Sequence, residues 1–375
     1  MQTIPPYGVE HKSESVFNGL CVSVDWLSFT FPADTKNSEL SVIKLLGFSI
    51  EDFYGDSKGQ YGYKSMYILQ KADLRIMYDG CNSDMGIHVS ASGTAISALL
   101  EAWKNKKTSS TPFGTEGIDL ADLRFTVLLD LLYTLAQTVR FKRIDLAIDD
   151  IGNHYYSCDD VCDKLQKKEF ISRFRSYTQL ASKRMKNNIK QGQTIYFGSR
   201  KSDSFLRIYD KKLEYEAKYH KVFYQPWTRW ELELKNDRAD RTVQQLLENK
   251  NLAEVCLGIL NNYIRFTIHL DDCEQNTVTD PKWEEFVNYS DKISLYMASE
   301  AKSIEDLEWW IDKQAGPAIA TIVEAHNGSF EFFEKNMPKW HYRRLYNKDY
   351  TNRLNHYWEQ KTKRNVNEKE ENCSS

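Results

Sequence analysis

The sequence predicts an α+β fold with a mostly antiparallel central sheet, covering helices and a helical C-terminal region. Three observations support this class. Short strand-like runs follow one another as hairpins, and hairpins pair antiparallel strands. Residues 94–104 and 120–137 show helical periodicity with apolar stripes, which suits helices that cover one face of a sheet. After a charged, proline-containing connector at 271–282, the pattern from Trp283 to Trp340 is mostly helical.

The first third of the chain supplies one helix and several strands. Residues 20–31 are rich in β-branched and aromatic side chains, and this strand ends at Pro32. Strict alternation places Asp25 on the face opposite Trp26, and we expect Asp25 to cap a turn rather than to act as a ligand. Further along, the patterns predict a helix at 38–54 and strands at 63–69, 74–78 and 85–92.

Three later strands, at 142–150, 205–209 and 228–234, each combine an apolar face with a charged face. The charged faces carry Arg143, Asp145 and Asp149 on the first, Arg207, Tyr209 and Lys211 on the second, and Arg229, Glu231 and Glu233 on the third. If these strands are neighbours in one sheet, their charged faces form one site. Carboxylate oxygens suit Mg²⁺ or Mn²⁺. The candidate metal ligands are therefore Asp145, Asp149, Glu231 and Glu233.

A hairpin organises the middle of the chain, because two short strands flank the turn-forming loop 198–203. On the return strand Tyr209 lies between two cations, Arg207 and Lys211. A phenol is a poor nucleophile at neutral pH, and neighbouring positive charge favours the phenolate. The pattern therefore indicates a candidate nucleophile. An ordinary surface hairpin with a half-exposed tyrosine is the alternative.

Basic residues are concentrated around this hairpin, although the net charge of the whole chain is −3. Between Lys164 and Lys212 there are fourteen Lys and Arg against three acidic residues. Phe170, Phe174 and Tyr177 are interleaved with them, which favours phosphate binding combined with base stacking. A solvated helix and loop is the alternative. The candidate DNA contacts are Lys183, Arg184 and Lys186 in this block, Arg200 and Lys201 at the loop tip, and Arg143 and Arg229 on the charged strands.

Composition excludes several classes of protein. No apolar run approaches the roughly 18 residues of a membrane-spanning helix, so no membrane partner is expected. The polar N-terminus lacks the apolar core of a signal peptide, and an odd count of seven cysteines argues against a disulfide framework. We expect a reduced, cytoplasmic protein. No Walker motif is present, so any unwinding of DNA must come from a separate helicase.

Five segments together resemble the replication initiation factor family, which comprises rolling-circle initiators of plasmids and related replication proteins and relaxases of phages and integrative conjugative elements. They occur in the family's order and span roughly residues 20–270. Each segment alone is weak, whereas five in register are fairly specific. The segments are 24–31, 143–150, 198–202, 206–212 and 229–234.

The resemblance implies a Rep/relaxase-like α+β fold and a site-specific, metal-dependent enzyme that nicks and closes DNA. In this family a tyrosine attacks one phosphodiester, keeps the 5′-phosphate covalently and leaves a free 3′-OH as primer. The matching tyrosine is Tyr209, flanked by Arg207 and Lys211, and Tyr215 is the second candidate because it has the same Tyr-x-x-Lys spacing. Similar enzymes bind their metal through a His-hydrophobic-His motif. None of the eight histidines here forms it, and the resemblance implies acidic ligands instead.

The sequence patterns predict a domain organisation, and the resemblance implies partners. We expect a flexible tail at 1–18, a nicking domain at 19–270, a mostly helical region at 271–357 and a charged, disordered tail at 358–375. The implied partners are origin DNA, as a single-stranded or hairpin nick site, and a helicase of the host or the element. A homodimer is also allowed.

Two other functions fit the same residues. One is a metal-dependent nuclease that uses water, with Tyr209 only positioning the DNA. The other is a non-catalytic DNA-binding replication regulator, in which the carboxylates merely pair with the arginines. Covalent attachment to DNA separates the nicking enzyme from both.

Overall fold

The chain divides into two compact units, which are described separately. They comprise Met1–Tyr296 and Met297–Ser375. The computed structural model describes residues 15–17, 20–33, 38–108, 120–185, 190–220, 222–268, 277–288, 290–295 and 311–345, with a few single positions between 304 and 361.

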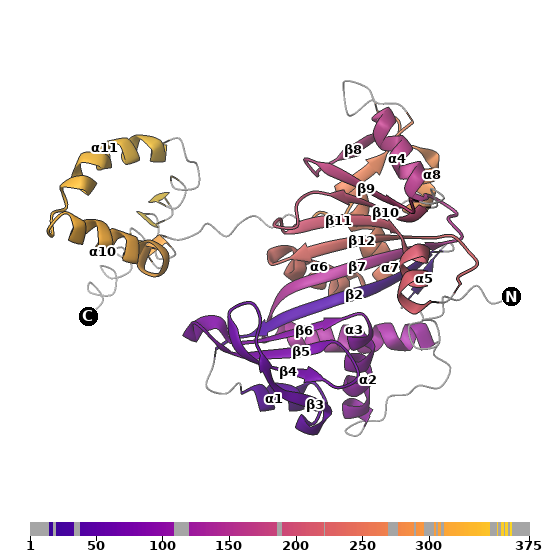
Figure 1. The fold of residues 1–375 in the computed structure, drawn as a ribbon, viewed down its shortest axis with the longest axis horizontal. Helices are drawn as coiled ribbons and strands as arrows, with labels where there is room; N and C mark the ends of the chain where they lie inside the picture. The colour runs from indigo at the N-terminus through magenta and orange to yellow at the C-terminus, as the bar shows by residue number, and fades with distance from the viewer. Residues whose placement is uncertain are drawn as a thin grey trace, which may run out of the picture. The chain divides into compact units, whose positions relative to one another are not determined.

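The first unit is built on an 11-stranded antiparallel sheet (Figure 1). The strands in spatial order are β3 (Phe53–Lys58), β4 (Tyr63–Leu69), β5 (Leu74–Gly80), β6 (Ile87–Ser92), β2 (Leu20–Phe31), β7 (Arg140–Ile151), β12 (Trp227–Lys235), β11 (Ser204–Asp210), β10 (Lys190–Phe197) and β9 (Tyr177–Lys183), with β1 (Ser15–Phe17) pairing to β2. A separate two-stranded sheet joins β8 (Phe170–Ser172) to β13 (Ile264–Phe266). The predicted α+β class with a mostly antiparallel sheet is confirmed.

Helices other than α5 pack against the apolar face of the large sheet. The helices of the first unit are α1 (Glu39–Leu45), α2 (Thr94–Thr108), α3 (Leu120–Ala136), α4 (Cys158–Lys167), α5 (Lys211–Tyr219), α6 (Asp237–Asn249), α7 (Leu252–Tyr263) and α8 (Pro281–Phe286). In Figure 1, α6 and α7 lie behind the central strands, and both contact β7. Helix α2 contacts β6 and β2. Two layers, helices on a sheet, therefore enclose the core.

The core takes the apolar sides of the strands that the alternation pattern singled out. On β7 Ile144, Leu146 and Ile148 are buried, and on β12 Trp230 is fully buried. The ring of Trp230 lies 5.8 Å from that of Trp283 in α8, centroid to centroid. The Trp230 ring also contacts the rings of Tyr156, Phe266 and Phe286. Helix α8 thus belongs to the core of the first unit, although it follows residue 270, the expected end of the nicking domain. That domain boundary stays a prediction.

Several local elements differ from the sequence prediction, among them β9, residues 15–17 and the first helix. Strand β9 was not predicted, because every residue of it is exposed and it therefore lacks the apolar alternation that marks a half-buried strand. Residues 15–17, assigned to the flexible tail, pair with β2 as a short strand. The helix expected at 38–54 is split into α1 and a 3₁₀ turn at Ile50–Asp52, each with its own capping box at the N-terminus.

The second unit consists of helices in its described part. These are a π-helical turn at Ile311–Ala315, α10 (Gly316–Ala325) and α11 (Glu331–Leu345). Within α11 the ring of Trp340 contacts those of Phe332 and Phe333. The predicted disordered tail lies largely outside the described residues. Among the helices that the structure describes, none has the length and apolarity needed to cross a membrane.

Substituting Trp283 by Ala tests the role of α8 in the core. This side chain is fully buried and its Nε1 donates a hydrogen bond to Asn261 Oδ1 at 3.0 Å. We expect the free energy of unfolding to fall by about 3–5 kcal/mol, as for other large buried aromatics. Urea denaturation followed by circular dichroism measures it. As a control, Trp340→Ala removes a ring that is 37% exposed and should cost less than about 1 kcal/mol. Equal losses would contradict this description.

Candidate active site

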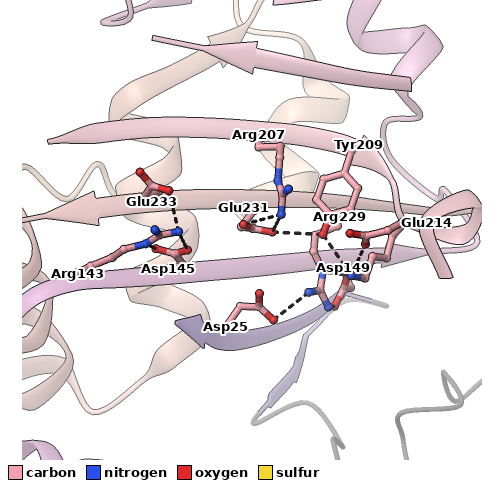
Figure 2. Close-up of polar contacts among 11 residues, drawn as sticks. Asp25, Arg143, Asp145, Asp149, Arg207, Tyr209, Glu214, Arg229, Glu231 and Glu233 are labelled. Carbon is pink, nitrogen blue, oxygen red and sulfur yellow. Dashed lines mark hydrogen bonds and ion pairs between the residues drawn. The ribbon is translucent and has the colours of Figure 1, made fainter. Parts of the chain in front are cut away.

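The register of the central strands brings the predicted charged faces side by side. Tyr209 on β11 lies opposite Arg229 on β12, which lies opposite Asp149 on β7. In the next row Arg207 lies opposite Glu231. Directly opposed residues project to the same side of a sheet. The merged face, shown in Figure 2, carries Arg143, Asp145, Asp149, Arg207, Tyr209, Arg229, Glu231 and Glu233.

Strand β2 completes this face through a β-bulge at Asp25. Val24 pairs with Leu146 and Trp26 with Asp145, so Asp25 is the inserted residue. The bulge turns Trp26 onto the charged face, whereas strict alternation predicted the apolar face. It also aims Asp25 at Arg229, whose Nη1 donates to Asp25 Oδ1 at 3.1 Å. The expected turn-capping role is therefore replaced by an ion pair.

The sequence did contain a signal for this bulge. The buried apolar residues of β2 are Leu20, Val22 and Val24 before it and Leu27, Phe29 and Phe31 after it. The buried residues have even numbers before the bulge and odd numbers after it. A strand can make this change and keep one buried face only if an extra residue is inserted.

Arg229 is the most completely engaged cation of the site. Its Nε and Nη2 donate to the two oxygens of Asp149, each at 2.7 Å. Trp227 Nε1 also donates to Asp149 Oδ1, at 2.6 Å. Burial alone would lower the pKa of Arg229, but the carboxylates of Asp149 and Asp25 raise it well above its usual value. For Asp25, burial raises the pKa, and the charges of Arg229, Lys211 and Arg207 bring it below the ordinary value.

Arg143 joins two carboxylates at the other end of the face. Its Nε and Nη2 donate to Asp145 at 2.8 and 2.6 Å, and Nη2 also lies 2.7 Å from Glu233 Oε2. The guanidinium stacks on the Trp26 ring at 4.4 Å from the centroid. Burial raises the pKa of Asp145 to about 7, against the opposing effect of Arg143. Lys235 pairs with the second oxygen of Glu233.

Tyr209 lies where the charges converge, and it is only 4% exposed. Its hydroxyl donates to Glu231 Oε2 at 3.2 Å and accepts from Lys211 Nζ at 3.3 Å. Arg207 Nη2 in turn donates to both oxygens of Glu231, at 2.8 and 2.6 Å. The guanidinium of Arg207 also lies 4.4 Å from the centroid of the Tyr209 ring. Figure 2 shows Tyr209, Glu231 and Arg207 with the hydrogen bonds that connect them, together with Glu214. Glu214 pairs with Lys211.

The protein environment keeps Tyr209 protonated. Burial is the largest effect and raises the pKa of the phenol well above its usual value, and the carboxylate of Glu231 adds to this. Arg229 and Arg207 lower the pKa, as the neighbouring cations were expected to do, but they do not outweigh burial. A nucleophilic role for Tyr209 would therefore require a base that accepts its proton.

Helix α5 closes one end of the charged face and explains the burial of Tyr209. Its Tyr215 packs in an apolar cluster with Ile151, Phe223 and Trp227. The rings of Tyr215 and Trp227 lie 6.3 Å apart. Tyr215, the second candidate nucleophile, thus lies among apolar side chains, whereas Tyr209 lies among charged ones. This difference favours Tyr209.

The four predicted metal ligands do not form a ready-made cage. Within the residues that the structure describes, no group of three or more His, Cys, Asp or Glu side chains is arranged to hold a metal ion. Each of the four carboxylates is instead paired with Arg or Lys. Their hard oxygens still suit Mg²⁺ or Mn²⁺, and Mg²⁺ is commonly bound by one or two carboxylates plus substrate phosphates. The donor set fits an ion that binds together with a phosphate group.

The predicted DNA contacts occupy a second region, the β9–β10 hairpin and the β10–β11 loop. Lys183 and Arg184 lie at the exposed end of β9, Arg200 and Lys201 are exposed in the loop, and Lys186 falls outside the described residues. The three residues expected to stack on DNA bases differ in their exposure. Phe170 and Phe174 pack against the core, whereas Tyr177 is exposed.

Comparison with known proteins places this chain in a family. It is 28% identical over 324 residues to the protein named "Putative DNA relaxase NicK" of Bacillus subtilis (strain 168), which covers 84% of this chain and 85% of that protein. The structure of a rolling circle replication initiator protein from Geobacillus stearothermophilus matches with a TM-score of 0.59 and 26% identity, covering 74% of this chain and 98% of that one. The model of the family described as "Replication initiation factor" matches residues 139–337. This match spans more than half of the sequence and includes the charged strands, and the chain therefore belongs to the replication initiation factor family.

Proposed function

We propose that this protein nicks one DNA strand at a specific origin, with Tyr209 as the nucleophile, and so initiates rolling-circle replication or strand transfer. The observation that carries this proposal is the position of the Tyr209 hydroxyl between Glu231, which accepts its proton, and Lys211, which donates to it. The names of the two relatives, a relaxase and a rolling-circle initiator, support the same reaction.

In the proposed reaction, the bond that forms at phosphorus replaces the bond that breaks, and a residue of the charged face accepts the proton of the nucleophile. Glu231 takes the proton of Tyr209 as the phenol oxygen attacks the scissile phosphorus. The bond from phosphorus to the 3′ oxygen breaks, and that oxygen takes up a proton from solvent and leaves as a free 3′-OH. Glu231 returns the proton that it received to solvent, so the number of protons is unchanged. The 5′-phosphate stays on Tyr209. Because one phosphodiester replaces another, the strand can be rejoined without ATP.

The cations have separate tasks in this mechanism. Arg207 holds Glu231 with two hydrogen bonds and fixes its orientation toward the phenol. Lys211 lies within hydrogen-bonding distance of the attacking oxygen and stabilises negative charge there. Arg229 is buried and fully occupied by carboxylates, so it acts through its field rather than by gripping DNA. Arg143 is likewise paired, and both become DNA contacts only if DNA displaces a carboxylate.

We propose that Mg²⁺ or Mn²⁺ joins the site together with the scissile phosphate. The predicted ligands are Asp145, Asp149, Glu231 and Glu233. Because the mechanism above uses Glu231 as the base, Asp145, Asp149 and Glu233 are the candidates that remain to hold the ion. Such an ion would polarise the phosphate and offset charge in the transition state. Its binding requires carboxylate oxygens to leave their Arg or Lys partners, and incoming phosphate is the anion best placed to receive those cations.

One observation favours a non-catalytic DNA-binding replication regulator as a second candidate function. Each of the four carboxylates is already paired with Arg or Lys, as expected of a purely structural charged face. A nuclease that uses water is a third possibility. Neither alternative explains why a buried tyrosine shares its hydroxyl between Glu231 and Lys211.

Replacing Tyr209 by Phe removes one oxygen and keeps the ring. If Tyr209 attacks phosphorus, no covalent DNA adduct can form, and the loss should be complete because a phenyl ring has no nucleophile. If Tyr209 only positions DNA, losing a hydrogen bond of about 1 kcal/mol should slow cleavage about fivefold. A nick-site oligonucleotide followed by denaturing electrophoresis and peptide mapping decides. Tyr215→Phe is the matched control and should retain the adduct. An adduct that maps to Tyr215 would reverse the assignment.

Asp145→Asn tests the metal proposal. The substitution keeps the shape and removes a hard anionic ligand, so cleavage should fall by about a hundredfold or more while DNA affinity changes little. Paramagnetic resonance of Mn²⁺ should show tighter metal binding with a nick-site oligonucleotide than without it. Full cleavage in excess chelator would eliminate the metal from the mechanism.

Salt dependence tests the predicted DNA contacts on the β9–β10 hairpin. Each phosphate neutralised by a cation adds about 0.9 to the slope of log affinity against log salt for duplex DNA. Replacing Lys183, Arg184 and Lys186 together by Ala should therefore flatten this slope measurably. Fluorescence anisotropy at several salt concentrations measures the slope. An unchanged slope would place the DNA elsewhere on the protein.

A further inference from the structure

Two aromatic rings lie on the charged face beside Tyr209. Tyr196 on β10 is directly opposite Arg207, and Phe205 on β11 is directly opposite Glu233, so both project to the same side of the sheet as Tyr209. Their ring centroids are 5.5 Å apart and the planes differ by 25°, a stacked arrangement. Tyr196 is partly exposed. Phe205 is only 4% exposed, so it supports the Tyr196 ring from the protein side.

A fixed cation lies over these rings. The guanidinium of Arg200 is 5.5 Å from the Tyr196 centroid and 5.0 Å from the Phe205 centroid. The loop that carries it is fastened to β12, because Lys235 Nζ donates to Arg200 O at 2.7 Å and Lys235 N donates to Asp203 O at 2.8 Å. In the described part of the chain no carboxylate forms an ion pair with Arg200. Unlike the paired arginines of the active site, it has its charge available for an anion.

We propose that Tyr196, Phe205 and Arg200 form a binding site for one unpaired DNA base and its phosphate, adjacent to the scissile phosphate. The inference rests on the proposed nicking function and adds where the strand lies. The partly exposed Tyr196 ring offers a flat apolar surface to a base, with the buried Phe205 ring stacked against it as support. Stacking of this kind tolerates any base. Arg200, with Lys201 next to it, provides positive charge for the phosphate.

The position of this site fits a strand held at Tyr209. Tyr196 is one strand and two residues away from Tyr209, a separation of about 8 Å in an antiparallel sheet. One nucleotide can span this distance. Both faces of a base are covered by its neighbours in a duplex, so the site selects a base that has been unstacked. It thus requires single-stranded DNA next to the nick, whereas the cations of the β9–β10 hairpin contact phosphates of either form.

Tyr196→Leu tests this inference with two probes of equal length, an oligothymidine and a strand of abasic sugar phosphates. For oligothymidine the dissociation constant should rise about fivefold to a hundredfold, the range for losing one stacked base. For the abasic strand it should not change. Tyr196→Trp keeps a stacking surface and should retain the affinity for oligothymidine, which excludes a general loss of folding.

Tyr133→Leu is the matched control. Tyr133 lies on α3 and is 62% exposed, whereas Leu128 and Leu131 of the same helix pack in the core against the apolar side of the sheet. It therefore lies away from the charged face, and its replacement should leave both dissociation constants unchanged. Equal weakening of both probes by Tyr196→Leu, or an effect of Tyr133→Leu as large as that of Tyr196→Leu, would overturn the proposed base site.

The two proposals can fail separately. At saturating nick-site oligonucleotide Tyr196→Leu should still form the covalent adduct, because its hydroxyl takes no part in the reaction. Tyr209→Phe should bind oligothymidine like the wild type and form no adduct. Loss of base discrimination in Tyr196→Leu thus tests the base site, and loss of the adduct in Tyr209→Phe tests the nicking function.

Discussion

The structure depends on pairing buried charges across neighbouring strands. Arg229 and Asp149 are both buried, and their two hydrogen bonds exist only because β12 and β7 are aligned so that the residues face each other. Removing one partner of such a pair costs about 3–5 kcal/mol, since the other is left charged away from water. A slip of one residue would move every charged side chain into the core. The charged face therefore fixes the register as firmly as the apolar face does.

In the proposed function, the same pairing separates a reactive part of the surface from a DNA-binding part. Around Tyr209 the cations Arg207 and Arg229 are committed to carboxylates, and their geometry is set before DNA arrives. At the β10–β11 loop Arg200 and Lys201 are exposed. Preorganised charge suits a transition state, because no reorganisation is needed at the moment of reaction. Exposed charge suits phosphate binding, which draws on the release of counterions.

Burial of Tyr209 connects the fold to the proposed chemistry. Helix α5 and the apolar cluster around Trp227 close one end of the charged face. Burial raises the pKa of the Tyr209 phenol, although two arginines lie close by. In the proposed mechanism the protonated phenol therefore depends on Glu231 as its base, and a bound phosphate would change the charge around both residues. Such an arrangement would keep a nicking enzyme from forming a phenolate before DNA binds.

The sequence by itself determined the fold class, most strands and helices, and the charged faces, because strict alternation on three strands has only one sheet-compatible interpretation. It also indicated Tyr209 as the candidate nucleophile. A change in the spacing of apolar residues marked the bulge at Asp25, but the sequence could not show that the bulge brings Asp25 to Arg229. It also could not determine strand β9, because the exposed side chains of that strand leave no periodic signal. Only the tertiary structure decided which carboxylate meets which arginine and how deeply Tyr209 is buried. Those properties arise from contacts between strands far apart in the chain, which no local pattern encodes.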